Sequence, residues 1–426
     1  MTTHPSHERV CGWNALLPDR VPAPPARGDL RADYLVVGAG YTGLAAARTR
    51  AEARPSDHVV VLDADAVGEG SPGRNSGFML EIALAEDADP AGVGRMAEMN
   101  DLTRRTTHWL AEHVERHAIT CGLVRCGTYR AAASTRGAKA IDAYRRFLEA
   151  AGLDHEVLDR SELARRLGTS HYRVGLHSPD CRLVQPAALI RGLASTLPAN
   201  VTLHEHSAVR HLERTADGDW VARTEDALVR APCLLLANNG WAGTLAGGAR
   251  HVTPVYTYAA LTEPVPGGLP GEDPEWGLLP AAKLGCTLRR TADDRVLIRS
   301  RYSYRREAPN DLIEVQLRDS LVRRWPELAD IPFAHVWGGS TGVTLGGAPL
   351  LGEIEPGCWA AIGCNGGGVV KGTLFGTELA RASLGEPTPD LTRLFGRPDP
   401  VPGEPWRGLG FRALTGLWAL QAGAEA

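Results

Sequence analysis

Two short apolar runs near the beginning of the chain predict the first strands of a buried parallel sheet. Residues 34–37 (Tyr-Leu-Val-Val) and 58–62 (His-Val-Val-Val-Leu) contain almost no strongly polar side chain. Continuous apolar runs of this length are typical of strands that are covered on both faces. The alanine-rich stretch that begins at Leu44 predicts a helix after the first strand, so the chain begins with a β-α-β pattern.

The pattern then changes to helical spacing. Between residues 90 and 150, apolar side chains recur at intervals of three and four, which predicts two helices separated by a strand within 122–133. A further helix is expected over 183–194, because Pro186 falls near its first turn, where proline is well tolerated.

Two kinds of sheet are expected in the second half of the chain. Residues 201–206 predict a strand, 208–212 are expected to continue the same sheet, and 231–237 predict a buried strand of the resumed parallel sheet. From residue 253 apolar and polar side chains alternate, which favours antiparallel strands with one covered face. Three segments have this alternation: 253–265, 295–304 and 333–338.

These patterns predict a fold that combines α/β and α+β architecture. One domain is Rossmann-like and binds a dinucleotide, and the other is a substrate domain built on an antiparallel sheet. The expected boundaries are 32–90, 155–250 and 340–395 for the Rossmann-like domain, and 91–154 and 251–339 for the substrate domain. The proline-rich residues 1–31 are expected to form an extended arm, and 396–426 a C-terminal tail helix.

The sequence Gly-Ala-Gly-Tyr-Thr-Gly at 38–43 lies between the first strand and the first helix. Gly38 permits the tight turn, Gly40 lets a pyrophosphate approach the backbone, and Gly43 allows close packing of helix and strand. The free N–H groups of that helix then face the phosphates. Asp63 ends the second strand, where an acidic residue binds the ribose hydroxyls and repels a 2′-phosphate.

Two further glycine-rich loops carry groups suited to a larger cofactor. Residues 68–79 contain four glycines, with Arg74, Asn75 and Ser76 among them, and are expected to contact a pyrophosphate, a ribityl chain or an isoalloxazine edge. Residues 364–372 follow a predicted strand and precede a helix, whose positive end would stabilise negative charge on a reduced flavin.

Composition makes several classes of function unfavourable. The net charge is −4 with acids and bases interspersed, so no basic face for nucleic acid is expected. The eight cysteines include no C-x-x-C pair, and His108, His113 and His117 have no suitably spaced carboxylate, so we expect reduced thiols, solvated histidines and no metal site. No apolar run approaches the roughly 18 residues of a membrane span, and no signal peptide is evident, which predicts a cytoplasmic protein.

The C-terminal run 406–420 places Phe411, Leu414 and Trp418 at helical spacing. Only Arg407 and Arg412 are basic there, which is too few for strong binding to anionic lipid. A helix that docks this stripe on its own chain or on a second subunit is therefore favoured, and the protein is expected to be a monomer or a homodimer.

Six segments, taken in order, point to a known family: 33–38 (D-Y-L-V-V-G), 71–77 (S-P-G-R-N-S-G), 183–186 (L-V-Q-P), 236–241 (L-A-N-N-G-W), 254–258 (P-V-Y-T-Y) and 363–368 (G-C-N-G-G-G). In these segments the chain resembles FAD-dependent oxidoreductases of the D-amino-acid oxidase superfamily. It is most similar to the branch of gamma-glutamylputrescine oxidase-like enzymes, and more distantly to glycine oxidase and monomeric sarcosine oxidase.

The resemblance implies a bound FAD and assigns its contacts. The ADP half would be held by Gly38, Gly40, Gly43 and Asp63, with their neighbours Tyr41, Thr42 and Ala64. Arg74, Asn75 and Ser76 would line the flavin side. Val209 would pair with adenine through its backbone, and Ala237 and Asn238 would cover the pyrophosphate. The last loop would lie against the pyrimidine edge through Gly366, Gly368, Val369, Val370 and Lys371.

Two departures from relatives bear on the chemistry. Relatives with a covalently attached flavin carry a cysteine in the stretch matching 337–340, or a histidine in the loop matching 74–75. This chain has neither, so FAD is expected to be non-covalent. Sarcosine oxidase has a lysine in the last loop that helps to bind the substrate carboxylate. Here the aligned residue is Val370, and Lys371 follows it.

The family likeness implies an amine or amino-acid oxidase. Hydride would pass from the substrate α-carbon to flavin N5, the imine would hydrolyse, and O2 would be reduced to peroxide. The candidate catalytic residues are Arg299, Arg301 and Tyr302 of the strand 295–304, together with Lys371. Regular alternation would place Arg299 and Arg301 on one face, where one of them binds a carboxylate or assists oxygen reduction. Solvated arginines at a sheet edge are the alternative.

Other functions remain open at this point. A flavin dehydrogenase of the same fold would pass its electrons to a quinone or a protein. An NAD-dependent dehydrogenase is disfavoured, because the second glycine-rich loop far along the chain is what a flavin clamp needs. A protein that keeps FAD as a structural group is the non-enzymatic alternative.

The first testable expectation concerns the cofactor. The purified protein should be yellow, and acid denaturation should release FAD into the supernatant, because the chain carries no attachment residue at the two matched positions. Absorbance of the supernatant and the pellet measures the partition. Flavin that stays with the precipitated protein would show that it is covalently attached.

Overall fold

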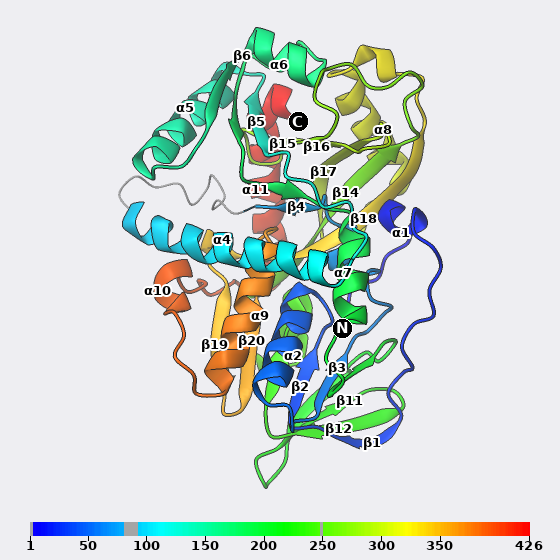
Figure 1. Ribbon diagram of the computed structural model, residues 1–426, viewed down its shortest axis with the longest axis vertical. Coiled ribbons are helices and arrows are strands. Elements are labelled where there is room, and N and C mark those ends of the chain that lie inside the picture. The colour runs from blue at the N-terminus through cyan, green and yellow to red at the C-terminus, as the bar shows by residue number, and fades with distance from the viewer. Residues whose placement is uncertain (1–2, 81–92, 248–249) are drawn as a thin grey trace.

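A computed structural model describes residues 3–80, 93–247 and 250–426. One half of the molecule is built on a six-stranded sheet that contains β2 (Figure 1). The order is β19-β20-β13-β2-β3-β9, and all neighbours are parallel except β19 and β20. The strands are β2 (Tyr34–Val37), β3 (Val59–Leu62), β9 (Val201–His204), β13 (Leu234–Leu236), β19 (Leu350–Glu355) and β20 (Cys358–Ile362). The parallel sheet expected from the apolar runs is confirmed.

Alternate side chains of β2 and β3 enter two different cores, because successive residues of a strand point to opposite faces. Tyr34 and Val36 pack among helices, whereas Leu35 and Val37 pack against a second, four-stranded sheet. That sheet has the order β1-β12-β11-β10 and consists of β1 (Gly28–Arg31), β10 (His211–Arg214), β11 (Trp220–Arg223) and β12 (Ala227–Ala231). Residues 208–212 therefore do not continue the parallel sheet, since β10 pairs with β11 instead.

Helices α2 (Tyr41–Ala53) and α9 (Val370–Ser383) lie side by side over one face of the parallel sheet, and α4 (Val93–Arg116) crosses them (Figure 1). Glycine allows the close approach of α2 and α9. A Cβ atom on Gly376 would lie 2.0 Å from the carbonyl oxygen of Thr42. Because both helices follow parallel strands, their N-termini meet at the same edge of the sheet.

An eight-stranded sheet forms the other half of the molecule, with the order β18-β14-β17-β16-β15-β5-β7-β6. All its pairs are antiparallel except β15 and β5, which confirms the antiparallel sheet expected from the alternating segments. Its strands are β5 (Thr128–Ala132), β6 (Glu156–Asp159), β7 (Val174–Ser178), β14 (Val252–Thr262), β15 (Trp276–Pro280), β16 (Thr287–Arg290), β17 (Val296–Tyr304) and β18 (Phe333–Thr344).

The assignment of strands to the sheets differs from the expected domain boundaries. β6 and β7 fall within the range 155–250 but pair with the eight-stranded sheet, and β18 runs past residue 339. Short strand patterns do not reveal which sheet a strand joins, since that depends on its partner. The expected boundary at 90 lies outside the described residues.

The remaining elements connect or cover these sheets. They are α1 (Gly12–Ala15), α3 (Ser71–Arg74), β4 (Phe78–Met79), α5 (Thr135–Ala150), α6 (Arg160–Leu167), β8 (Arg182–Leu183), α7 (Pro186–Ser195), α8 (Asn310–Val322), α10 (Leu391–Phe395), α11 (Trp406–Ala422), and 3-10 turns at Asn239–Thr244, Pro326–Leu328, Leu345–Gly347 and Gly423–Glu425.

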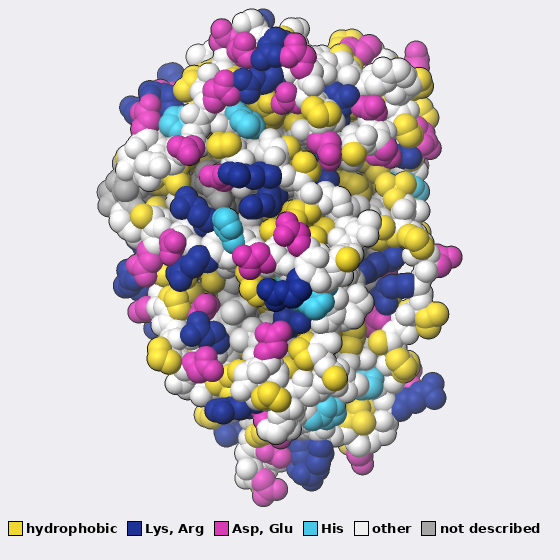
Figure 2. All heavy atoms as spheres, viewed as in Figure 1, with side chains coloured by type: hydrophobic (Ala, Val, Ile, Leu, Met, Phe, Trp, Pro, Cys, Tyr) yellow, Lys and Arg dark blue, Asp and Glu magenta, His cyan; other side chains and the backbone are white. Residues whose placement is uncertain are grey.

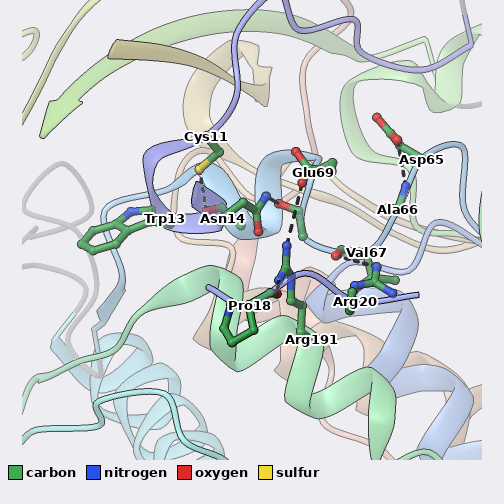
Figure 3. Close-up of polar contacts among 12 residues, drawn as sticks. Cys11, Trp13, Asn14, Pro18, Arg20, Asp65, Ala66, Val67, Glu69 and Arg191 are labelled. Atoms are coloured by element: carbon green, nitrogen blue, oxygen red, sulfur yellow. Dashed lines mark hydrogen bonds and ion pairs between the residues drawn. The ribbon is translucent and has the colours of Figure 1, made fainter. Parts of the chain in front are cut away.

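The N-terminal segment contains α1 and β1 and is fastened to the loop that follows β3 (Figure 3). Asn14 donates from Nδ2 to the carbonyl of Gly68 at 2.8 Å, and Arg20 donates to the carbonyl of Val67 at 2.9 Å. Arg191 of α7 reaches back to the carbonyl of Pro18 at 3.2 Å. The segment is thus more than an extended surface arm, because it holds the glycine-rich loop in place.

No helix within the described residues has the length and hydropathy to cross a membrane. On the face seen in Figure 2, acidic and basic side chains are interspersed.

His113 departs from the expectation of solvated histidines: it is buried, and its Nε2 lies 3.1 Å from Thr196 Oγ1. Burial, reinforced by the positive charge of Arg48, lowers the pKa of His113 to about 4.

The close approach of α2 and α9 gives a stability prediction. Gly376→Ala should lower the free energy of unfolding by about 1–3 kcal/mol, because its Cβ has no room beside the Thr42 carbonyl. The control is Gly416→Ala in α11, where a Cβ meets nothing within 4 Å. That change should raise stability by about 0.5–1 kcal/mol through helix propensity. Urea unfolding measures the free energy of unfolding of both variants. Equal changes in the two variants would contradict the inference that Gly376 is required for close helix packing.

Candidate cofactor and substrate site

A cavity of about 1180 Å³ lies between the two halves of the molecule. Its wall includes the carboxyl ends of β2 and β3 and also residues of the eight-stranded sheet. Pockets for small molecules usually measure about 300–1,000 Å³, so this one has room for a large cofactor and a substrate. Its position at the carboxyl edge of a parallel sheet is where ligands of such folds bind.

The first glycine-rich turn has the geometry that its sequence predicts. Gly38 has a φ of +107°, which side-chain-bearing residues rarely adopt. A Cβ on Gly43 would lie 1.8 Å from the carbonyl oxygen of Gly38, so only glycine lets α2 pack this close to the turn. Gly40 lines the cavity, whereas Gly43 lies behind the wall and acts through packing.

Asp63 lies in the cavity wall beside this turn. Its Oδ2 accepts from the Ala39 N–H at 2.6 Å, and its Oδ1 accepts from the Asp65 N–H at 3.1 Å. Burial raises the pKa of the Asp63 carboxyl to about 6, despite these two hydrogen bonds, which favour the ionised form. Asp63 is therefore a carboxylate at neutral pH that titrates close to the physiological range.

In the loop that contains α3, Arg74 acts as a buried junction. It donates from Nη1 to the Gly338 carbonyl at 2.9 Å and from Nη2 to the Arg9 carbonyl at 2.9 Å. The guanidinium thus joins the loop to β18 and to the N-terminal segment. Asn75 accepts from the Gly77 N–H at 2.8 Å, which shapes the turn that follows. These residues line the cavity, but their polar groups are largely engaged within the protein.

The last glycine-rich loop brings a second helix N-terminus to the same cavity. Asn365 fixes the loop by accepting from the Thr344 N–H at 2.9 Å and donating to the Gly363 carbonyl at 2.7 Å. Val369 and Val370 then begin α9 at the wall, next to Lys371. The positive ends of α2 and α9 both face the cavity, an arrangement that favours a bound anion.

Several buried polar atoms of the wall have no hydrogen-bond partner among the described residues. They are Ser76 Oγ, Thr257 Oγ1, and both Oδ1 and Nδ2 of Asn238. Burial of an unpaired polar group costs about 1–3 kcal/mol, so such atoms are normally satisfied by a ligand or by water. Together with the glycine cradles and Asp63, they fit a polar cofactor such as FAD.

The strand β17 places Arg299, Tyr302 and Tyr304 in the cavity wall, but not Arg301. The register shifts between Thr257 and Tyr258 of β14, so Arg301 is an extra residue with a φ of +65°. Its guanidinium donates to Ser320 Oγ of α8 at 3.0 Å. The expectation that Arg299 and Arg301 share a face is therefore wrong, because a β-bulge interrupts the alternation.

All other expected site residues except Gly43 line this one cavity: Gly38, Gly40, Tyr41, Thr42, Asp63, Ala64, Arg74, Asn75, Ser76, Val209, Ala237, Asn238, Arg299, Tyr302, Gly366, Gly368, Val369, Val370 and Lys371. Further wall residues that the sequence did not predict come from β5, from the loop after β15 and from α11: Arg130, Lys283, Arg407, Phe411 and Trp418. Helical spacing identified Phe411 and Trp418, but not what they would face.

These features agree with a family comparison. The family model described as FAD dependent oxidoreductase (DAO) matches residues 33–382. The chain belongs to this family. It is an FAD-dependent oxidoreductase, and the glycine-rich turns lie within the matched range.

Relatives with curated descriptions match along most of their length. The chain is 30% identical over 395 residues to "Probable oxidoreductase OrdL" of Rhizobium meliloti, covering 88% of each chain. It is 26% identical over 371 residues to "Gamma-glutamylputrescine oxidoreductase" of Escherichia coli, covering 83% of this chain and 84% of the other.

Solved structures share the fold. Glycine oxidase from Geobacillus kaustophilus matches 88% of this chain and all of its own, with a TM-score of 0.74 and 21% identity. L-Amino acid deaminase from Proteus myxofaciens, solved in complex with anthranilate, matches 88% of this chain and 95% of its own, with a TM-score of 0.70 and 18% identity. Both confirm the pairing of a Rossmann-like sheet with a large antiparallel sheet.

The position and pKa of Asp63 give a prediction for cofactor binding. Asp63→Asn should weaken FAD binding about 10- to 150-fold, because it loses charge-assisted hydrogen bonds worth about 1.5–3 kcal/mol. In the wild type, FAD affinity should fall as the pH is lowered below about 6, where the carboxylate takes up a proton. The variant should lack that pH dependence. Titration of the apoprotein by flavin fluorescence between pH 5 and 8 measures both effects.

Asp65→Asn is the matched control, since Asp65 is exposed on the same loop and is not among the lining residues of the cavity. Its carboxylate accepts from the Ala66 N–H at 2.8 Å and lies 3.8 Å from His206 Nδ1, which is not a lining residue either. The affinity of the Asp65→Asn variant for FAD should stay within about threefold of that of the wild type. Equal losses in the two variants would mean that Asp63 has no specific role in holding the cofactor.

Proposed function

We propose that the protein is an FAD-dependent oxidase of amines that carry a carboxylate, that is, of amino acids or N-substituted amino acids. The charge of the cavity wall supports this proposal. Asp63 is the one carboxylate among the described lining residues. The cations of the described wall are more numerous: Arg74, Arg130, Lys283, Arg299, Lys371 and Arg407. Such a wall attracts an anionic substrate and disfavours a polyamine.

Arg299 is the observation that carries the proposal. Its guanidinium makes no hydrogen bond or ion pair with the described residues, and its one ring contact is with Tyr302, 5.7 Å from the ring centroid. Thr257 and Ala259 of β14, which pair with residues of β17, line the same cavity. An arginine held in a cavity without an anionic partner is suited to bidentate binding of a carboxylate.

The names of similar proteins agree with this substrate class. The Escherichia coli relative is named for gamma-glutamylputrescine, and the solved structures include a glycine oxidase and an L-amino acid deaminase. All three names refer to compounds that contain an amino group. We extend that chemistry to this chain on the strength of the shared family and the basic cavity wall.

The division of labour between cofactor and protein follows from the wall. Bound FAD would accept a hydride equivalent from the carbon beside nitrogen and pass the electrons to O2, giving an imine and H2O2. Arg299 would hold the carboxylate, which fixes the reacting carbon in one orientation. Lys371 and the α9 N-terminus would stabilise negative charge at the far end of the ring system. We propose that FAD is held without a covalent bond, as the absence of an attachment residue at the matched positions supports.

The described wall offers no carboxylate near Arg299 that could take the amine proton. We infer that the substrate reacts with its amine already neutral, so kcat/KM should rise with pH as the amine of the free substrate loses its proton.

Arg299 provides the test. Arg299→Gln should raise KM for an amino-acid substrate about 10- to 150-fold, because a charge-assisted pair worth about 1.5–3 kcal/mol is lost. KM for the matching amine without a carboxylate should change little. Arg301→Gln is the control, since Arg301 bonds to α8 outside the cavity. The assay is anaerobic bleaching of the flavin with a panel of amines and amino acids, followed by measurement of peroxide in air.

Two outcomes would count against the proposal. Equal losses for substrates with and without a carboxylate would mean that Arg299 does not bind that group. Bleaching without peroxide in air would show that the electrons go to another acceptor, as in a dehydrogenase.

A further inference from the structure

We infer that α11 forms the wall of the substrate end of the cavity and selects substrates with an apolar or aromatic side chain. This inference rests on the proposed function, because it takes the cavity to be the substrate site. The family model ends at residue 382, so α11, at Trp406–Ala422, lies beyond the part of the chain that the family match covers. Selectivity at this wall would therefore be set by a segment outside that match.

One face of α11 looks into the cavity and the other faces outward. Beyond Trp406 at the start of the helix, the residues of α11 that line the cavity recur at helical spacing: Arg407, Gly410, Phe411, Leu414, Thr415 and Trp418. Leu409 and Leu420 lie on the opposite face and are 52% and 84% exposed. The helix seen near the centre of Figure 1 is thus a cavity wall rather than a peripheral tail.

The inner face of α11 meets the strand that carries Arg299. The rings of Phe411 and Tyr304 have centroids 5.3 Å apart, and Tyr304 lies on β17. Farther along the helix, Lys283 Nζ lies 5.0 Å from the Trp418 ring centroid. Both partners line the same cavity. The aromatic wall therefore contacts the strand that also carries Arg299.

Both ends of α11 are anchored. Glu404 accepts from the Tyr304 hydroxyl and from Arg305 Nη1, the latter at 3.0 Å. Beyond the helix, Glu425 is buried and accepts from the N–H groups of Ala133 at 3.0 Å and Ser134 at 2.9 Å. A carboxylate at the N-terminus of α5 is favoured by the helix dipole. These anchors fix the position of the inner face, which a selective wall requires.

The chemistry of the wall defines the substituent. Phe411, Leu414 and Trp418 offer apolar and aromatic surface, so burial of an apolar group there is favourable. Lys283 and Arg407 flank this surface. A cationic side chain would meet the like charge of Arg407, whereas an apolar one would pack against Phe411, Leu414 and Trp418. The wall therefore favours an amino acid with an aromatic or aliphatic side chain over one with a basic tail.

The test uses two carboxylate probes. Anthranilate carries an aromatic ring with an amino group, and acetate carries neither. Each is titrated into the FAD-loaded protein, and binding is read from the change in the flavin absorbance spectrum. Phe411→Ala and Trp418→Ala should each weaken anthranilate binding at least about tenfold and leave acetate binding and FAD content unchanged. Leu409→Ala and Leu420→Ala, on the outer face, should bind anthranilate as the wild type does.

The outcomes separate this inference from the proposed function. If inner and outer variants lose anthranilate equally, or if anthranilate does not perturb the wild-type flavin, the wall is not selective and the inference is overturned. If anthranilate binding depends on Phe411 but no amine bleaches the wild-type flavin, the proposed oxidase function fails instead. Phe411→Leu is the control for misfolding, because it keeps an apolar side chain. It should retain wild-type thermal stability and bind anthranilate with an affinity between those of the wild type and Phe411→Ala.

Discussion

The site depends on how closely helices can approach the parallel sheet and one another. Gly43 lets α2 pack against the turn after β2, where any Cβ would collide with the Gly38 carbonyl. Gly376 allows the same closeness between α9 and the Thr42 carbonyl. These contacts are between backbones, so no rotamer change can relieve a larger residue. They hold two helix N-termini at one edge of the sheet, where their partial positive charges add.

From that constraint follows a cavity with two different ends. Near α2, Asp63 supplies a carboxylate whose pKa is raised by burial, suited to neutral hydroxyl donors. Towards β17 and α11 the described lining is basic and aromatic. A ligand with sugar hydroxyls at one end and a carboxylate-bearing molecule at the other would meet complementary groups. On the proposed function, the charge of this wall would help to place the cofactor at one end and the substrate at the other.

The two ends of the chain complete the site from outside the family-matched range. The N-terminal segment pairs with the glycine-rich loop through Asn14 and Arg20, and Trp13 donates to the Asn75 carbonyl at 2.8 Å. Arg74 joins that segment to β18 by donating to carbonyls in both. Loss of this buried cation would leave several carbonyls unsatisfied at once. The glycine-rich loop 68–79 is thus fastened by hydrogen bonds to a part of the chain that is distant in sequence.

The sequence by itself determined the elements whose signal is local. A β-α-β unit with a dinucleotide turn is specified by the runs at 34–37 and 59–62, the glycines at 38–43 and Asp63. Strand burial requires consecutive apolar residues and a positive φ favours glycine, so both can be recognised from residues close together in the sequence. Alternation likewise identified the antiparallel strands from residue 253. Only the tertiary structure decided which sheet β6, β7 and β10 join, since a short strand does not encode its partner. It also decided that a bulge turns Arg301 away from Arg299, and that α11 faces the cavity: both depend on register and packing between segments far apart in the chain.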